Sequence, residues 1–233
     1  MAAMKITIVI PAFNEEENLK HLLPYLREYS AGYVDEIIVS DGGSSDATAK
    51  VAARLGATVV VSPKKGRAAQ MNFGAAHAGA EIIYFLHADS YPPKNFDFDI
   101  ISAINRGAVG GCFLLSFDDK SRLLKLYSVF TALKSAYVRF GDQSLFVKCD
   151  VFSAIGGFRE DHIVMEDQEI VHRLKDAGNF ELIQKQVITS ARKYRENGIV
   201  RLQAIFSIIY FLYYSGASQQ TLVHIYNSLI RTD

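Results

Sequence analysis

Side chains that could bind a metal and a phosphate follow directly after apolar runs in the first ninety residues. The run from Ile82 to Leu86 leads into "HADS", in which one alanine separates His87 from Asp89. Asp41 follows "DEIIVS", and Arg67 ends the segment "SPKKGR". Magnesium and manganese take a few protein ligands and complete their shell with phosphate oxygens and water, while lysine and arginine offset further phosphate charge. These residue types predict a metal-assisted phosphate site, if the fold brings them together.

The apolar runs alternate with segments of helical spacing, which is typical of a parallel α/β sheet. The runs predict strands at 5–10, 35–40, 57–62 and 81–86, and the spacing predicts helices at 15–29, 45–56 and 66–79, the second of them capped by Ser44 or Ser45. Right-handed crossovers then cover both faces of the sheet with helices. Ligands of such sheets bind beyond the carboxyl ends of the strands, so we expect one site there that contains Asp41, Arg67, His87 and Asp89.

The second half of the chain alternates less regularly, and no Ser-, Gly- or Pro-rich linker separates it from the first. Helices are predicted at 96–105, 121–140, 151–155 and 166–177, and strands at 110–117 and 143–148. We therefore expect one domain over residues 1–233. The apolar residues of the long helix are predicted to belong to the core: Leu123, Leu124, Leu126, Tyr127 and Phe130.

Charge and cysteine usage exclude some classes of protein. The 25 basic residues balance 25 acidic ones, so net charge supports no general attraction to nucleic acid. Cys112 and Cys149 lack metal-ligand spacing, which favours free thiols in a reducing compartment. The start of the chain lacks the pattern of a secretory signal peptide. We expect a cytoplasmic protein.

The apolar run from Ile205 to Gly216 leaves two interpretations open. It is about half the length of roughly 20 residues that a membrane-spanning helix needs. It is either a buried helix or a helix on the inner face of a membrane. In the second case, upstream basic residues would meet anionic head groups: Arg192, Lys193, Arg195 and Arg201.

Five motifs resemble those of the family 2 glycosyltransferases, whose fold is called GT-A. They are "TIVIPAFNEEENL", "VSDGGSSDATA", "KGRAAQMNFGAAHAGAEIIYFLHADS", "GGF" at Gly156–Phe158, and "MEDQEIVHRL". They occur in the order and approximate spacing of that family and cover residues 4–178. A dinucleotide site would instead need G-x-G-x-x-G after the first strand, where this chain has "PAFNEE".

The resemblance implies a mainly parallel GT-A sheet with helices on both faces and a Rossmann-like first half. Residues of about 4–115 would bind a nucleoside-diphosphate sugar, about 116–198 would serve the acceptor and catalysis, and about 199–233 would form C-terminal helices. The loops after the first two strands would hold the nucleotide through Pro11, Phe13, Glu15 and Asp41.

The resemblance also places the metal, Mn²⁺ or Mg²⁺, at "HAD", where relatives have Asp-x-Asp. Asp89 matches the last acid of that motif, and His87 stands in place of the first. Imidazole can accept a hydrogen bond from ribose or ligate manganese. Gly42 is a second departure, because many relatives have an acid there.

The pair Glu166 and Asp167 opens a predicted helix, and the resemblance selects Asp167 as the catalytic base. Asp142 and Gln143 lie where relatives often contact the sugar or acceptor, although a turn with a surface glutamine explains them nearly as well. Arg192 and Arg195 resemble basic loops that close on the diphosphate; a solvated basic loop is the alternative.

The sequence thus predicts a non-processive, inverting glycosyltransferase that moves a sugar from a nucleoside diphosphate to an acceptor hydroxyl. The acceptor is not identified by the sequence, and a lipid-linked one is compatible with an apolar helix at a membrane. Two other classes stay open. A sugar nucleotidyltransferase would carry a glycine-rich basic loop after its first strand, and a non-catalytic nucleotide-sugar binder would explain the departures at Gly42 and His87.

Overall fold

The computed structural model describes residues 4–130 and 144–231. The strands of this part of the chain form one eight-stranded sheet. Its order is β3-β2-β1-β4-β7-β6-β8-β5, and β7 and β5 run antiparallel to their neighbours. In chain order the strands are β1 (Ile6–Ala12), β2 (Val34–Asp41), β3 (Thr58–Val61), β4 (Ile82–Phe85), β5 (Ser90–Tyr91), β6 (Gly110–Phe117), β7 (Leu145–Lys148) and β8 (Phe180–Thr189). The predicted mainly parallel α/β sheet is confirmed.

Helices cover both faces of this sheet, because its inner strands are apolar on both sides. In β1, Ile8 and Ile10 pack in the core that holds α1 (Glu16–Tyr29), α2 (Thr48–Arg54) and α4 (Phe96–Asn105). Val9 points the other way, into the core that holds α3 (Arg67–Ala75), α6 (Cys149–Ala154) and α7 (Glu166–Ala177). The two periodicities, 2 in the strands and 3.6 in the helices, therefore meet in two apolar layers.

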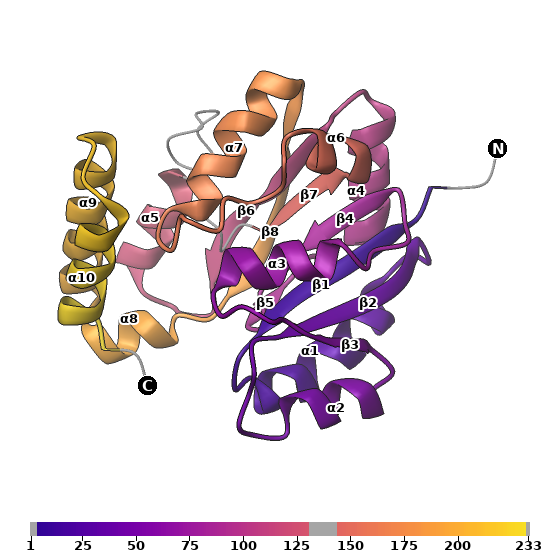
Figure 1. Cartoon of the computed structure of the whole chain (residues 1–233), viewed down its shortest axis with the longest axis horizontal. Coiled ribbons are helices and arrows are strands. Elements are labelled where there is room, and N and C mark those ends of the chain that lie inside the picture. Colours follow the sequence, from indigo (N-terminus) through magenta and orange to yellow (C-terminus); the bar gives the residue numbers. More distant parts are fainter. Residues whose placement is uncertain (1–3, 131–143, 232–233) are drawn as a thin grey trace.

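The remaining helices form a third apolar cluster at one end of the molecule (Figure 1). They are α5 (Arg122–Phe130), α8 (Arg192–Asn197), α9 (Ile199–Tyr214) and α10 (Gln219–Leu229). Figure 1 shows α9 and α10 side by side, beyond the edge of the sheet. None of the helices in the described part of the chain is long and apolar enough to cross a membrane.

The register of the parallel strands places their carboxyl ends at one edge. Ala12 of β1 pairs with Asp41 of β2, Asp41 pairs with Val61 of β3, and Val9 of β1 pairs with Phe85 of β4. The loops after all four strands consequently leave the sheet on the same side. This confirms the predicted arrangement of the strand ends.

Two local predictions are wrong. Ser44 and Ser45 do not cap α2, which begins only at Thr48, because Ser44 binds Asp41 at the end of β2 and Ser45 binds Asn14 in the loop after β1. Leu123 and Leu126 are not core residues: they are 42% and 52% exposed, because α5 packs on the third cluster through one face, which includes Leu124 and Tyr127. The part of the predicted helix beyond residue 130 lies outside the described residues.

The apolar run near the C-terminus combines features of both earlier interpretations. Ile205 and Ile209 of α9 are buried in the third cluster. On the opposite side of the same helix, Ile208 and Phe211 are 50% and 70% exposed. The helix is therefore packed through one stripe and presents a second apolar stripe outward.

Candidate active site

The triplet after β4 presents His87 and Asp89 on the same side of the chain. Both are partly exposed, whereas Ala88 and Ser90 between and after them are buried. The Ser90 hydroxyl donates a hydrogen bond to Thr189 Oγ1 of β8 at 3.0 Å, which fixes the backbone of the triplet. The imidazole and the carboxylate therefore emerge together at the carboxyl edge of the sheet.

Glu15, which precedes α1, belongs to the same group of charges. Burial raises its pKa, and the negative charge of Asp89 raises it further, while Arg192 and His87 act in the opposite direction. Electrostatic coupling of this kind requires proximity. The loops after β1, β4 and β8 thus contribute Glu15, His87, Asp89 and Arg192 to one region.

The ligands that this triplet offers suit a metal ion shared with a bound diphosphate rather than one enclosed by protein side chains. No three His, Cys, Asp or Glu side chains converge into a metal site within residues 4–130 and 144–231. Asp89, with His87, leaves most of a six-coordinate shell to other ligands. That arrangement suits Mg²⁺ or Mn²⁺ bound to a diphosphate, because these ions take one or two carboxylates plus phosphate oxygens and water.

Asp41 stabilises the loop that follows β2. It is 4% exposed, and its carboxylate accepts hydrogen bonds from the Ser44 amide and hydroxyl. Asn14 is in the left-handed conformation at φ 55°. Its side-chain Oδ1 accepts a hydrogen bond from the Ser45 backbone amide at 2.9 Å, and its own backbone amide donates one to Ser44 Oγ. The loops after β1 and β2 are therefore one hydrogen-bonded unit, and Asp41 anchors it to the end of β2.

Gln70 explains why residue 42 is a glycine. The buried amide of Gln70 donates to the carbonyl groups of Ala12, at 2.8 Å, and Ser40, at 3.0 Å, and so links β1 to β2. A Cβ atom on Gly42 would lie 2.9 Å from Gln70 Nε2. The space for a side chain at position 42 is thus filled by Gln70. A buried glutamine in an alanine-rich helix was the only sequence feature that could have indicated this link.

Glu166 and Asp167 lie at the start of α7 and share one arginine. Arg67, the first residue of α3, places Nη1 3.2 Å from Glu166 Oε1 and 3.6 Å from Asp167 Oδ2. The Glu166 side chain is 5% exposed, and burial, then the Asp167 charge, raises its pKa to about 7 against the opposing effect of Arg67. The contact of Arg67 with this acidic pair was not predicted from the sequence, which grouped Arg67 with Asp41, His87 and Asp89.

Asn72 joins α3 to the segment that precedes α7. Its side-chain amide donates to the Phe158 carbonyl, and its Oδ1 accepts from the Phe158 amide, both at 2.8 Å. Gly157 has φ 66°, and a Cβ atom there would lie 2.7 Å from Asn72 Oδ1. The "GGF" motif therefore serves this contact: glycine is required both for the left-handed backbone and for the close approach of Asn72.

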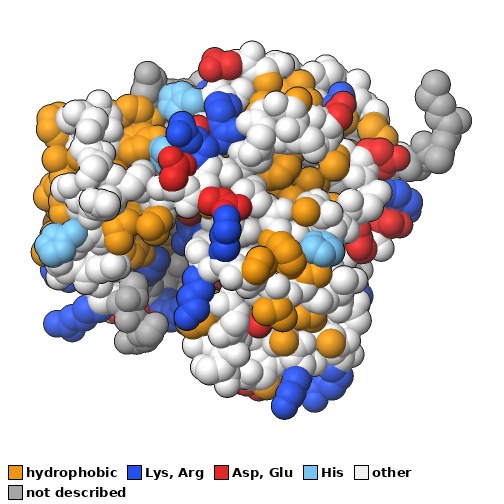
Figure 2. Space-filling view, in the orientation of Figure 1, with side chains coloured by type: hydrophobic (Ala, Val, Ile, Leu, Met, Phe, Trp, Pro, Cys, Tyr) orange, Lys and Arg blue, Asp and Glu red, His pale blue; other side chains and the backbone are white. Residues whose placement is uncertain are grey.

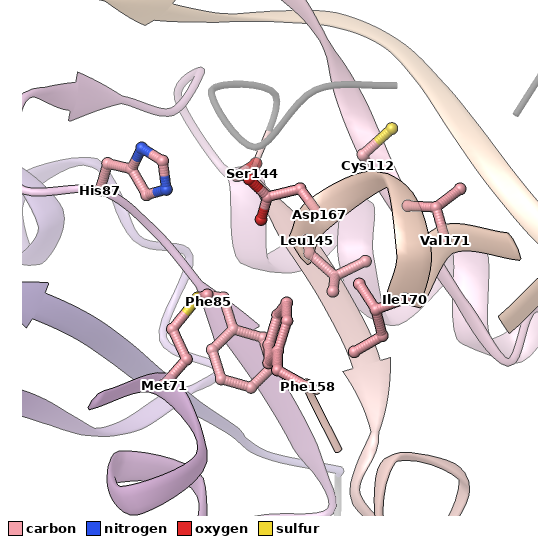
Figure 3. A pocket seen from close by; sticks show the side chains of 10 residues that line it. All are labelled: Met71, Phe85, His87, Cys112, Ser144, Leu145, Phe158, Asp167, Ile170 and Val171. Atoms are coloured by element: carbon pink, nitrogen blue, oxygen red, sulfur yellow. The ribbon is translucent and has the colours of Figure 1, made fainter. Parts of the chain in front are cut away.

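A small cavity separates the two halves of the site. Its volume is about 20 Å³, which is room for one water molecule. Figure 3 shows the His87 ring and the Asp167 carboxylate on opposite sides of this space, with Phe85, Phe158 and Met71 closing one wall. One metal-binding candidate, His87, and one member of the acidic pair, Asp167, thus line the same cavity.

The other expected site residues have different outcomes. Pro11 was expected in the loop after the first strand but lies within β1, and Phe13 directly follows that strand and is 52% exposed. Arg195 forms ion pairs with Asp118, at 3.1 Å, and Asp119, at 3.6 Å, and thereby binds α8 to the end of β6. Asp142 and Gln143 lie outside the described residues. The roles of all these residues toward a ligand remain predictions.

Comparison with known sequences identifies the class of protein. The profile of glycosyl transferase family 2 matches residues 7–160, and the chain belongs to this family. The match ends before Glu166. An uncharacterized glycosyltransferase of Mycobacterium tuberculosis is 35% identical over 108 residues, which cover 46% of this chain and 47% of that protein. The succinoglycan biosynthesis protein ExoA of Rhizobium meliloti is 27% identical over 192 residues, which cover 73% and 58%. The chain thus spans about half the length of these relatives.

Solved structures show the same GT-A fold at low sequence identity. The mannosyltransferase PcManGT of Pyrobaculum calidifontis, in complex with GDP-Man and Mn²⁺, has a TM-score of 0.71 at 16% identity, covering 98% of this chain and 70% of that one. Glucosyl-3-phosphoglycerate synthase of Mycobacterium tuberculosis, in complex with Mn²⁺, UDP and its product, has a TM-score of 0.66 at 18% identity, covering 93% and 81%. The predicted family and fold are therefore confirmed.

The burial of Glu166 predicts how stability depends on pH. Its pKa is about 7 in the folded chain against an ordinary 4.5, so between these values the folded state binds more protons than the unfolded state. The free energy of unfolding should therefore fall as pH rises through this window. Glu166→Gln removes this dependence, and its stability relative to wild type should rise by up to about 3 kcal/mol from pH 4.5 to pH 8.

Urea unfolding of both proteins across this pH range measures the difference, with Glu28→Gln, at an exposed position of α1, as the control. Parallel pH curves for wild type and Glu166→Gln would show that the buried carboxyl is not protonated in this way.

Proposed function

We propose that this chain is an inverting glycosyltransferase that transfers a sugar from a nucleoside-diphosphate donor to an acceptor hydroxyl. The observation that carries the proposal is the cavity at the strand ends, which His87 lines on one side and Asp167, the neighbour of the buried Glu166, lines on the other. One side can hold a diphosphate through a metal, and the other can take a proton. A nucleotidyltransferase needs the first but not a base placed opposite.

The donor half of the crevice is proposed to extend over residues of about 4–115. Asp89, with His87, would hold Mn²⁺ or Mg²⁺ on the diphosphate, and the metal would supply neutralisation of the charge that develops on the departing nucleotide. The solved neighbours support this assignment, because they contain Mn²⁺ with UDP or GDP-Man. Pro11, Phe13 and Asp41 would bind the nucleoside, and Arg67 and Arg192 would approach the phosphates.

The acceptor half, over residues of about 116–198, is proposed to supply the base. Asp167 would take the proton of the acceptor hydroxyl while the acceptor oxygen forms the new bond to the anomeric carbon. The bond from that carbon to the diphosphate breaks on the opposite side, so the configuration inverts and the nucleoside diphosphate leaves. Glu166, buried beside Arg67, would orient its neighbour instead of contacting the acceptor.

We also propose that the outer face of α9 rests on an anionic lipid surface, where a lipid-linked acceptor would be delivered. Val200, Ile208 and Phe211 lie on one exposed stripe of this helix. Figure 2 shows hydrophobic side chains gathered along the edge of the molecule where Figure 1 places α9. The segment 198–231 contains no Asp or Glu, but it contains Arg201 and Arg231. An apolar stripe with basic and without acidic neighbours complements anionic head groups.

The first test concerns the metal. Asp89→Ala should weaken Mn²⁺-dependent binding of UDP or GDP at least about tenfold, since even residues that only support metal ligands typically contribute 10- to 100-fold. Calorimetry with and without EDTA measures the effect, and Asp35→Ala, exposed at the opposite end of β2, is the matched control. Unchanged affinity in the presence of Mn²⁺ would remove Asp89 from the metal site.

The companion variant His87→Asp should preserve or strengthen Mn²⁺-dependent nucleotide binding. Complete loss of this binding would show that His87 has a role that only imidazole fills.

The second test concerns the base. Asp167→Asn should lower turnover with the true acceptor by about 10²- to 10⁴-fold, the usual contribution of general-base catalysis, with donor affinity nearly unchanged. Asp176→Asn, at the exposed far end of α7, is the control. A screen of nucleotide sugars with Mn²⁺ identifies the reaction: release of nucleoside diphosphate supports transfer, and release of pyrophosphate supports nucleotidyl transfer. Wild-type turnover in Asp167→Asn would contradict its assignment as the base.

The third test concerns the lipid surface. The protein should co-sediment with anionic vesicles at low salt and dissociate near 1 M salt, because the Debye length falls from about 10 Å at 0.1 M to about 3 Å. The double variant Ile208→Ser/Phe211→Ser should lose this binding, whereas Phe98→Ser, at an aromatic of α4 that is 51% exposed, should keep it. Failure of the wild type to bind at low salt would refute the proposal.

A further inference from the structure

The loop before Glu166 and Asp167 is held by one side chain from α10. Gln219 Oε1 accepts hydrogen bonds from the backbone amides of Ile163, at 3.1 Å, and Val164, at 3.2 Å. Its Nε2 donates to the Val164 carbonyl at 3.0 Å. These backbone groups offer two donors and one acceptor, and the amide side chain of Gln219 matches both kinds with its separate oxygen and nitrogen.

A second contact joins the end of α9 to α7 itself. The Tyr214 hydroxyl donates to Oε1 of Gln168 at 3.1 Å and lies 2.9 Å from His172 Nε2. Gln168 is 1% exposed and follows Asp167 directly in the chain. Tyr214 therefore binds two positions of α7 that are one turn apart, so it constrains the rotation of this helix about its axis as well as its position.

Apolar packing supports these polar contacts. Val164 and Met165 pack against the third cluster, which is built from α5, α8, α9 and α10. Met165 ends the loop in the left-handed conformation at φ 69°, which is unfavourable for an unbranched side chain and has to be maintained by its surroundings. The loop from Ile163 to Met165 thus rests on the C-terminal helices rather than on the sheet.

We propose that the α9–α10 hairpin is a positioning element for catalysis, in which Gln219 and Tyr214 set the place and rotation of the acidic pair at the start of α7. Arg67 approaches this pair from α3 on one side, and the hairpin holds it from the other. Neither Gln219 nor Tyr214 is proposed to touch substrate. The inference rests on the proposed role of Asp167 as the base.

The consequence is specific to one half of the reaction. The donor candidates Glu15, His87 and Asp89 lie on the loops after β1 and β4, and these loops have supports of their own: the Glu15 backbone amide donates to Thr48 Oγ1 at 2.8 Å, and the Ser90 hydroxyl donates to Thr189 of β8. Loosening the hairpin contacts should therefore displace the base but leave the donor site in place. A merely structural contribution would instead lower stability, donor binding and turnover together.

The decisive variants differ in how many of the loop bonds they keep. Gln219→Leu removes all three bonds at similar volume, and Gln219→Glu keeps an acceptor for the two amides but loses the donor to Val164. Tyr214→Phe removes the hydroxyl and keeps the ring. Gln220→Leu is the matched control, because Gln220 is the exposed neighbour of Gln219 on α10.

Steady-state kinetics, with the donor and acceptor that the wild-type enzyme uses, measure the effect. We expect kcat to fall about tenfold or more in Gln219→Leu, less in Gln219→Glu, and not in Gln220→Leu, with the Kd of the Mn²⁺–nucleotide complex within twofold of wild type. The acid limb of kcat/KM against pH should also move, because displacement of α7 changes the burial of Glu166. Equal kcat in Gln219→Leu and Gln220→Leu, or parallel loss of turnover, donor affinity and Tm, would overturn the inference.

Hydrogen exchange separates this inference from the proposed reaction. In Gln219→Leu, amides of the first turn of α7, residues 166–170, should exchange at least about tenfold faster than in Gln220→Leu, and amides of β1 and β4 should not. Unchanged exchange in α7 would overturn the positioning role even if the enzyme transfers sugar. Faster exchange in a protein that transfers no sugar from any donor would refute the proposed function while supporting the structural coupling.

Discussion

The structure of the candidate site depends on the burial of one carboxyl group. Glu166 lies at the junction of α3, α7 and the crevice, with Asp167 beside it and Arg67 as the cation that contacts both. A buried carboxylate is unfavourable unless it is paired or protonated, and here both compensations are available. Every element that holds α7 against α3 therefore also influences the ionisation of Glu166.

Three contacts maintain that junction from one side. Asn72 pairs with both backbone groups of Phe158, the Gly157 backbone admits this close approach, and Lys64 forms an ion pair with Glu160 at 2.7 Å. The ion pair is exposed and contributes little by itself. The paired hydrogen bonds of Asn72 are more significant, because they fix the segment that leads into the loop before α7. The apparently irregular stretch between α6 and α7 is thus tied to α3, which begins with the arginine of the site.

The sequence predicted the elements whose physics is local. The β-branched runs and the spacing of leucines in α1 are sufficient to predict the strands, the helix and the edge at which the strands before Asp41 and His87 end, because the direction of parallel crossovers is nearly invariant. The family motifs then selected Asp89 and Asp167. The wrong cap at Ser44 and Ser45 arose because capping and loop-bridging serines have the same local pattern, and only the position of Asn14 decides between them.

Contacts between distant segments could not be predicted in the same way. Gln70 and Asn72 lie in a helix whose spacing indicates only an apolar face, and the partners that link them to other elements are backbone groups, which leave no trace in sequence. Leu123 and Leu126 were assigned to the core because helical spacing shows that a face is apolar but not that a neighbour covers it. The same limitation applied to Gln219, a polar residue at a helix start whose partners lie 55 and 56 positions earlier.

Gly42 shows how a departure from the family pattern can be compensated within the fold. An acid at this position would compete with Gln70 for the same space, so the glycine and the glutamine are one feature of the β1–β2 edge rather than two. The link keeps the carboxyl ends of β1 and β2 together without a charge at position 42. The loops that hold Asp41 and Asn14 are then positioned by a neutral amide, and Glu15 and Asp89 contribute interacting negative charges to the same edge. These charges would suit the proposed cation shared with a phosphate, in a motif where His87 replaces the first acid.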